Sequence, residues 1–216
     1  MMEAMTAENA KEMLLYVADK IIGEKDYLTQ IDSTIGDGDH GIGMSGGMKK
    51  VKEKLENQDF DDVYAVFAAA GKSMLMSMGG ASGVIFGSLY LAGAKNMSMA
   101  AEISAKELAE MKRKSLEAIK ERGKANVGDK TMVDALEPAV IAMEENSDKS
   151  LLEMLTAAEA AAQQGVEDTK QYVAKFGRAK SLFDRAIGHQ DAGATTVWLI
   201  FQGMREYIEK HDGYKV

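Results

Sequence analysis

The stretch GGASGVIFGSLYLAGA, at positions 79–94, joins a glycine-rich junction to a segment that is apolar on nearly all of its sides. A helix that is hydrophobic all round lies inside a protein rather than on its surface. We therefore predict a central, buried helix over residues 82–94. The rest of the chain has only one proline, Pro138, and is rich in Ala, Met, Leu, Lys and Glu, which favour helices. The composition predicts a helical protein whose glycines are confined to junctions.

Hydrophobic periodicity extends the helical prediction to both sides of this stretch. Apolar residues recur at helical spacing over 6–22, 42–55, 60–78, 104–122, 131–145, 150–174 and 192–210. The last segment resembles a buried strand in composition, but its length and its helical context favour a helix. Connections are short, except for a glycine-rich loop expected near residues 26–43, and short connections favour antiparallel neighbours. We predict one all-α domain over residues 1–216, an eight-helix antiparallel up-and-down bundle or barrel.

Composition excludes several classes of function. The 26 Lys and Arg against 34 Asp and Glu give a formal net charge of −8, which argues against nucleic-acid binding. The sequence holds no run of about 18 apolar residues that would span a membrane, and its first residues are too acidic for a secretory leader. The absence of cysteine excludes disulfides and fits a reducing cytoplasm. Three histidines leave little for a multi-histidine metal site.

The densest chemical signal is IDSTIGDGDHGIG, residues 31–43. Asp32, Asp37 and Asp39 are close in sequence, and three crowded carboxylates repel one another unless they are solvated or share cations. Mg²⁺ prefers oxygen ligands and is commonly held by carboxylates together with phosphate oxygens. A solvated acidic turn is the alternative, because Asp and Gly are ordinary turn residues. The third Asp, the flanking glycines and the adjacent His40 favour a metal–phosphate site.

Other glycine motifs are weaker when taken singly. Two matches to the dinucleotide-binding pattern, at 36–41 and 41–46, follow no convincing strand, and the sequence GKS at 71–73 lacks the first glycine of a P-loop. The motifs GGASG at 79–83, GDKTMVD at 128–134, GR at 177–178 and GHQDAG at 188–193 each fall at a helix junction, where caps or surface charges would explain them. In an up-and-down array alternate junctions share one end, so these motifs could converge on a single site.

As an ordered set, IDSTIGDGDHG, GGASG, GDKTMVD, GRA and GHQDAGAT resemble the nucleotide-binding L subunit of the dihydroxyacetone kinases, over about residues 27–201. The resemblance implies an eight-helix antiparallel barrel that binds ADP or ATP and two Mg²⁺ ions at one end. It also implies a nucleotide that stays bound as a coenzyme. A phosphotransferase-system subunit would recharge that nucleotide, which would then phosphorylate dihydroxyacetone, or a related ketose, held on a separate K subunit.

The same resemblance implies roles for individual residues. Asp32, Asp37 and Asp39 would ligate magnesium, and Arg178 and His40 are the candidate catalytic residues. The nucleotide would be held by His40, Gly41, Ile42, Gly43, Ala81, Ser82, Gly123, Thr131, Met132, Arg178, Asp191, Ala192 and Gly193. The chain departs from the family's usual residues at Gly43, Gly46, Ala192 and the run 180–186. These departures lie where a partner subunit would dock. We therefore expect a preference for a cognate partner.

A second class of function stays open at this point. A nucleotide-loaded module that regulates a transcription factor or another partner, without turnover, would need the same bound ADP and the same carboxylates. The intact Asp32, Asp37 and Asp39 favour the enzyme subunit without excluding this alternative. A purely structural helical bundle leaves the three crowded carboxylates unexplained.

Overall fold

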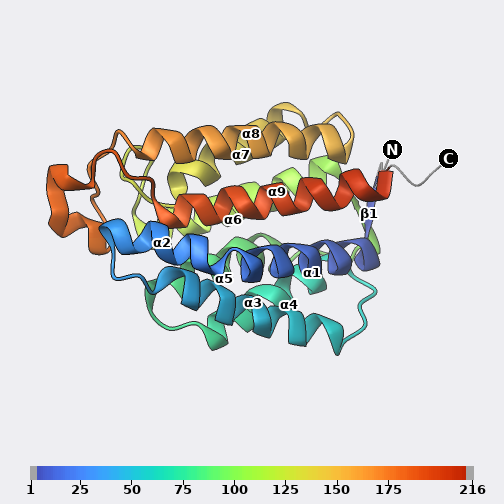
Figure 1. The fold of residues 1–216 in the computed structure, drawn as a ribbon. Helices are drawn as coiled ribbons and strands as arrows, with labels where there is room; N and C mark the ends of the chain where they lie inside the picture. Colours follow the sequence, from blue (N-terminus) through green and yellow to red (C-terminus); the bar gives the residue numbers. More distant parts are fainter. Residues whose placement is uncertain (1–3, 213–216) are drawn as a thin grey trace.

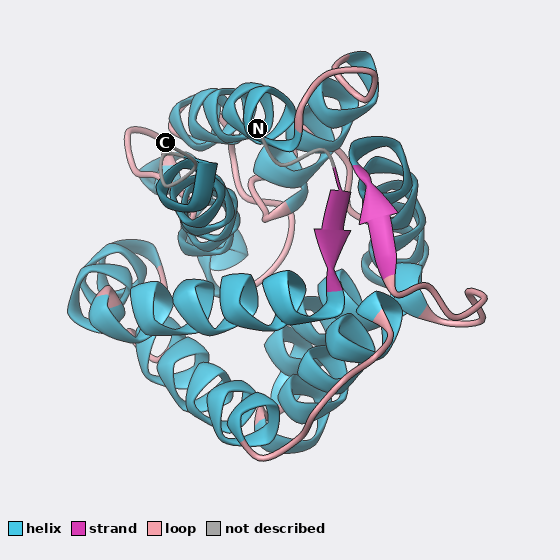
Figure 2. Cartoon of the chain, turned by 90° about the vertical axis from the view of Figure 1, so that its right-hand side faces the viewer, coloured by secondary structure: helices cyan, strands magenta, loops and turns pink. Residues whose placement is uncertain are grey.

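Eight helices close into a ring in the computed structural model, which describes residues 4–212 (Figure 1). In ring order they are α1 (Ala7–Gly23), α3 (His40–Glu56), α4 (Val63–Ser77), α5 (Gly80–Ala94), α6 (Ala105–Gly123), α7 (Val133–Glu145), α8 (Leu151–Thr169) and α9 (Ala192–Asp212). Each helix packs against the next, and α9 packs against α1. The end-on view in Figure 2 shows this closed arrangement. The predicted eight-helix antiparallel barrel is confirmed.

Four smaller elements lie outside the ring. Helix α2 (Lys25–Ile35) follows α1 directly, the 3-10 helix η1 (Arg178–Ala186) precedes α9, and β1 (Ala4–Thr6) pairs antiparallel with β2 (Glu102–Ser104). The loop expected near residues 26–43 is therefore wrong for residues 26–35, which lie in α2, and for residues 40–43, which begin α3. Helix α2 buries only Leu28 and Ile35, so its apolar pattern was too sparse to stand out in the sequence.

Side-chain caps explain where several helices begin. Thr6, Ser104 and Ser150 each accept a hydrogen bond from the backbone amide three residues later, and a side chain at that later position reaches back to the cap's amide. Such reciprocal capping boxes satisfy two amides that would otherwise lack partners. Helix α8 ends at Thr169, earlier than the predicted position 174.

The barrel interior is filled by apolar side chains from every ring helix. The prediction of a buried helix holds for α5 beyond its first turn, because Phe86, Leu89 and Tyr90 are buried while the opening residues are exposed. Small residues let the helices approach closely: a side chain on Gly93 would collide with the Met111 carbonyl of α6. Tight packing of this kind fixes the relative positions of the helix ends.

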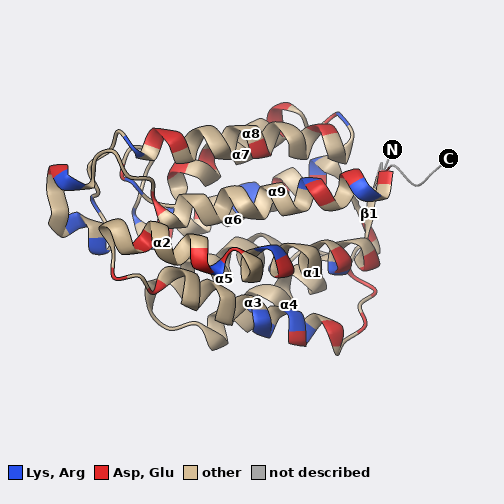
Figure 3. Ribbon diagram, in the orientation of Figure 1, with Lys and Arg blue, Asp and Glu red and all other residues tan. Residues whose placement is uncertain are grey.

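Charged residues lie mostly on the outward helix faces, with acidic and basic positions interspersed (Figure 3). At one end of the barrel the basic residues of η1 lie near the acidic connection between α2 and α3. Within residues 4–212 no helix is both long enough and apolar enough to cross a membrane.

Candidate functional site

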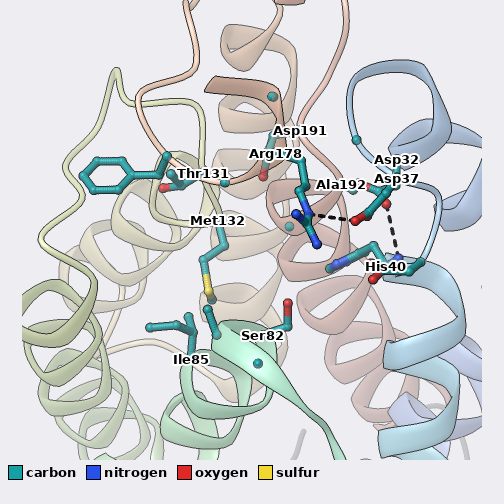
Figure 4. Close-up of a pocket in the computed structure, with 18 of the residues that line it drawn as sticks. Asp32, Asp37, His40, Ser82, Ile85, Thr131, Met132, Arg178, Asp191 and Ala192 are labelled. Atoms are coloured by element: carbon teal, nitrogen blue, oxygen red, sulfur yellow. Dashed lines mark hydrogen bonds and ion pairs between the residues drawn. The ribbon is translucent and has the colours of Figure 1, made fainter. Parts of the chain in front are cut away.

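A pocket of about 610 Å³ opens at the end of the barrel where four junctions meet. These are the connections α2–α3, α4–α5, α6–α7 and α8–α9, so the alternate junctions converge as expected. Twelve of the residues singled out in the sequence line this pocket: Asp32, Asp37, Asp39, His40, Ala81, Ser82, Thr131, Met132, Arg178, Asp191, Ala192 and Gly193. Figure 4 labels nine of these twelve residues around the cavity, together with Ile85.

Three carboxylates form one cluster at the pocket wall. Asp32 lies in the last turn of α2, and Asp37 and Asp39 follow it in the loop, where Gly38 has a φ of 74° that favours glycine. One carboxylate oxygen from each residue lies within 4.8 Å of the other two. Burial, followed by the neighbouring Asp37 and Asp32 charges, raises the pKa of Asp39. A hard divalent cation would relieve this repulsion, and all the ligands offered are oxygens.

Arg178 reaches the carboxylate cluster from η1. Its Nε lies 2.7 Å from Asp37 Oδ2, with 76% of the Arg178 side chain and 40% of the Asp37 side chain exposed (Figure 4). An ion pair this exposed contributes little to stability. The guanidinium is therefore free to exchange this carboxylate for an anionic ligand.

Helix N-termini supply a second kind of anion site. Helices α3, α5 and α9 begin at His40, Gly80 and Ala192, and each of these residues lines the pocket. The N-cap residues of α3 and α5, Asp39 and Gly79, make no side-chain capping hydrogen bond, although the His40 amide of α3 donates to Asp32. Uncapped amides and the helix dipole favour phosphate groups at such positions. The pocket thus combines cation ligands with anion donors.

His40 is held in place by two hydrogen bonds. Its backbone amide donates to Asp32 Oδ2 at 3.3 Å, and its Nε2 lies 2.8 Å from the Thr196 hydroxyl oxygen. Thr196 donates its own proton to the Ala192 carbonyl, so it accepts from Nε2 and leaves Nδ1 as the free acceptor. Burial lowers the pKa of His40. The ring is thus neutral near pH 7 and contributes no positive charge to the pocket.

Asp191 is a half-buried carboxylate that lines the pocket just before α9. Its Oδ2 accepts a 2.7 Å hydrogen bond from the Ala194 amide and so caps α9. Burial raises the pKa of Asp191 to about 7. This carboxyl group is therefore partly protonated at neutral pH.

Four predicted nucleotide contacts do not line the pocket: Gly41, Ile42, Gly43 and Gly123. Gly41 lies against α2, where a side chain would collide with the Lys25 carbonyl and with Thr29. Its glycine allows two helices to approach closely. Gly123 lies behind Ile85, whose Cδ1 would be 3.7 Å from a Cβ at that position.

The pocket also contains residues that sequence reasoning did not assign to it. Ile35, Ile85, Phe86 and Phe176 give it an apolar wall, and Lys130 lies beside Thr131. In Figure 4 the Met132 side chain points toward Ile85. These residues come from four different segments, and of them only Phe176 lies outside the stretches singled out in the sequence. The arrangement has a charged side for phosphates and cations and an apolar side for a flat ring.

Comparisons with known proteins agree with this chemistry. The DAK2 domain family matches residues 34–206. The ADP-binding subunit DhaL of the PEP-dependent dihydroxyacetone kinase of Escherichia coli (strain K12) is 38% identical over 181 residues, which are 83% of this chain and 86% of that protein. A corresponding subunit of PEP-dependent dihydroxyacetone kinase 2 from Listeria innocua is 36% identical over 190 residues, covering 87% of this chain and 88% of that protein.

A solved structure has the same fold. The dihydroxyacetone kinase from C. freundii in complex with AMP-PNP and Mg²⁺ superposes with a TM-score of 0.72 at 25% identity, covering 91% of this chain and 33% of that chain. This chain thus spans about a third of that kinase. Together with the two relatives, the match shows that the chain belongs to the DAK2 domain family.

Proposed function

We propose that this chain is the ADP-binding subunit of a phosphoenolpyruvate-dependent dihydroxyacetone kinase and transfers a phosphoryl group from a tightly bound nucleotide. The observation that carries the proposal is the convergence of Asp32, Asp37, Asp39 and Arg178 on one pocket with an apolar wall. The two DhaL relatives are named as ADP-binding subunits, and this chain covers most of their length. That correspondence supports a separate subunit rather than a fused kinase.

The carboxylate cluster is the proposed site of two Mg²⁺ ions. Asp32, Asp37 and Asp39 offer six oxygens, and their close spacing is unfavourable without cations. Bound magnesium would neutralise the charge of the nucleotide phosphates during transfer. The solved relative with AMP-PNP and Mg²⁺ supports this pairing of ligands.

The nucleotide is proposed to lie across the pocket. Its phosphates would face the N-termini of α3 and α5, where Ala81, Ser82 and His40 line the cavity, as Arg178 does. Its base lies against the apolar wall near Met132, and Asp191 to Gly193 close the site. Gly41, Ile42 and Gly43 contribute through the N-terminus of α3 rather than through side chains, and Gly123 supports the wall behind Ile85.

Catalysis in this proposal is positioning and charge stabilisation. Phosphoryl transfer needs little covalent chemistry from the protein. Arg178 is exposed enough to follow the moving phosphoryl group, and its cation stabilises charge that develops in the transition state. His40, neutral and anchored to Thr196, orients the start of α3 and offers Nδ1 as an acceptor.

The proposed partner subunits would act at the open end of the pocket. A K-type subunit would present dihydroxyacetone or a related ketose there, and a phosphotransferase-system subunit would recharge the nucleotide, both within the cytoplasm. The run 180–186 directly follows the pocket residues Arg178 and Ala179 and exposes most of its residues. It also departs from the family's usual residues, which supports recognition of a cognate partner. Nothing in the described residues favours the regulatory alternative, so the kinase subunit is the function that we propose.

Analysis of the bound small molecule tests the proposal. The purified protein is denatured and the released material is chromatographed, with an Asp32→Asn, Asp39→Asn double variant as the matched control. We expect about one nucleotide per chain from the wild type and almost none from the variant. A wild-type protein that neither carries nor binds ADP in the presence of Mg²⁺ would contradict the assignment.

A further inference from the structure

Lys130 is a buried ammonium that joins three separate parts of the chain. Only 2% of the residue is exposed, although it lies beside Thr131 at the pocket. Its Nζ donates to the carbonyl of Thr169, at the end of α8, and to the carbonyl of His189, in the segment before α9, each at 2.5 Å. One side chain thus ties the α6–α7 junction to both ends of the α8–α9 connection.

Two neighbours of Lys130 in the motif GDKTMVD, at 128–134, form further hydrogen bonds that stabilise this connection. Asp129 accepts a 2.6 Å hydrogen bond from Lys175 Nζ, and its carbonyl accepts from the Lys175 amide at 3.1 Å. Asp134 folds the motif upon itself by accepting from the amides of Gly128 and Thr131, both at 2.6 Å. The segment 128–134 is therefore a hub that holds the α8–α9 connection against the pocket.

The backbone of Lys130 indicates that its side chain is needed there. Its φ is 59°, in the left-handed region that glycine tolerates and other residues rarely adopt. Non-glycine residues persist in such conformations where the surrounding structure fixes them, and they cluster at functional sites. Glycine at this position would relieve the strain but would lose both hydrogen bonds to the α8–α9 connection.

The ties end on the residues that close the pocket. The buried Thr169 hydroxyl accepts a 3.0 Å hydrogen bond from the Asp191 amide, so the carbonyl and the hydroxyl of Thr169 link Lys130 to Asp191. Gly193 and Met132 also pack closely against each other, because a Cβ placed on Gly193 would lie 3.4 Å from Met132 Cβ. The contact between Met132 and Gly193, both of which line the pocket, thus depends on the hub.

We infer that Lys130 is a positioning residue that sets how slowly the nucleotide leaves, by holding Thr131 and Met132 against the Asp191–Gly193 segment. This inference rests on the proposed function, because it assigns the base to the apolar side of the pocket. The carboxylate cluster and the N-termini of α3 and α5 come from other segments than the α8–α9 connection, so the binding of magnesium and phosphate by these groups does not depend on Lys130. The hub explains how a pocket built from junctions can retain a nucleotide through repeated transfers.

The test compares ADP with pyrophosphate, which carries the phosphates but no base. Dissociation of labelled ADP·Mg²⁺ into excess unlabelled ADP, and the affinity for pyrophosphate·Mg²⁺, are measured for the wild type, Lys130→Met and Thr169→Val. Lys112→Met is the matched control, because Lys112 is another buried lysine but lies in the barrel core rather than at the pocket. Circular dichroism establishes that each variant is folded.

We expect Lys130→Met to release ADP at least tenfold faster while its affinity for pyrophosphate changes less than twofold. Thr169→Val, which keeps Lys130 but removes the tie to Asp191, accelerates release by a smaller factor, and Lys112→Met leaves it unchanged. If Lys130→Met does not fold, the rate of ADP release from Thr169→Val alone tests the inference. Wild-type release from the folded variants, or equal losses for ADP and pyrophosphate, would overturn the inference. A wild type that binds neither ligand would instead overturn the proposed function, and this inference with it.

Discussion

Replacing Lys112 by methionine should stabilise the protein, with a gain that depends on pH. Lys112 of α6 is 1% exposed, and its Nζ lies 5.1 Å from the ring centroids of both Phe67 and Tyr90. It makes no hydrogen bond to any described residue. Burial lowers the pKa of Lys112 from 10.5 to about 7. Methionine has similar length and no charge to desolvate, so it fits the same place in the core.

The magnitude follows from the difference between the two pKa values. Between about pH 7 and 10.5 the unfolded chain binds a proton that the folded chain does not, so stability from this group rises with pH across that window. The penalty is complete below pH 7 and absent above 10.5. At ~1.4 kcal/mol for each pKa unit it reaches at most ~5 kcal/mol, and the two cation–π contacts return about 1 kcal/mol each. We expect Lys112→Met to gain ~3 kcal/mol at pH 6. At pH 10, still inside that window, the gain falls to ~2 kcal/mol, of which about 1 kcal/mol is the remaining charge penalty and about 1 kcal/mol is the cost of an unpaired amine.

Urea unfolding at pH 6, 8 and 10 measures this effect. The control is Lys106→Met, on the exposed face of the same helix, which should change stability by less than about 0.5 kcal/mol. Subtracting the wild-type curve removes the contributions of the other titrating groups. A Lys112→Met variant no more stable than the wild type at pH 6, or a gain that does not shrink by pH 10, would refute the reasoning.

Three further predictions concern the pocket. Asp37→Asn should abolish the retention of ADP·Mg²⁺ without changing the far-ultraviolet circular dichroism, because the cations lose a charged ligand; full nucleotide content in the purified variant would contradict the metal assignment. Removing Mg²⁺ and nucleotide with a chelator should lower the melting temperature by several degrees, because the repulsion among the three carboxylates, ~1–2 kcal/mol, is no longer relieved. An unchanged melting curve would count against a cation site at these carboxylates. Arg178→Ala should slow phosphoryl transfer by ~100-fold in reconstituted turnover while ADP affinity changes less than fivefold; equal losses in both would make Arg178 a ground-state contact.

The ring of helices was predictable from the sequence because each ring helix has an apolar face long enough to show a period. Helix α2 was not, since only two of its residues are buried and its last turn runs into the glycine-rich motif. The absence of proline from most of the chain identified helices but not their closure into a barrel. That closure depends on contacts such as those between α1 and α9, which are far apart in sequence.

The candidate site, like the fold, was only partly predictable from the sequence. Asp32, Asp37 and Asp39 were found because they are neighbours in the sequence, and the structure brings their oxygens together. Phe176 and Ile85 reach the pocket only through the convergence of junctions, and no local pattern marks them. Gly41 is a different case, because its packing against α2 explains the glycine by itself, and its predicted ligand contact stays a prediction.

Tracing one labelled phosphoryl group tests the central claim most directly. The protein, purified with its nucleotide, is mixed with a phosphotransferase-system subunit charged from labelled phosphoenolpyruvate, first alone and then with a K-type subunit and dihydroxyacetone. We predict that the label enters the bound nucleotide without exchange into free ADP. It should reach dihydroxyacetone only after the K-type subunit is added. Phosphorylation of dihydroxyacetone from free ATP by the isolated chain, or a bound nucleotide that never acquires the label, would contradict the account.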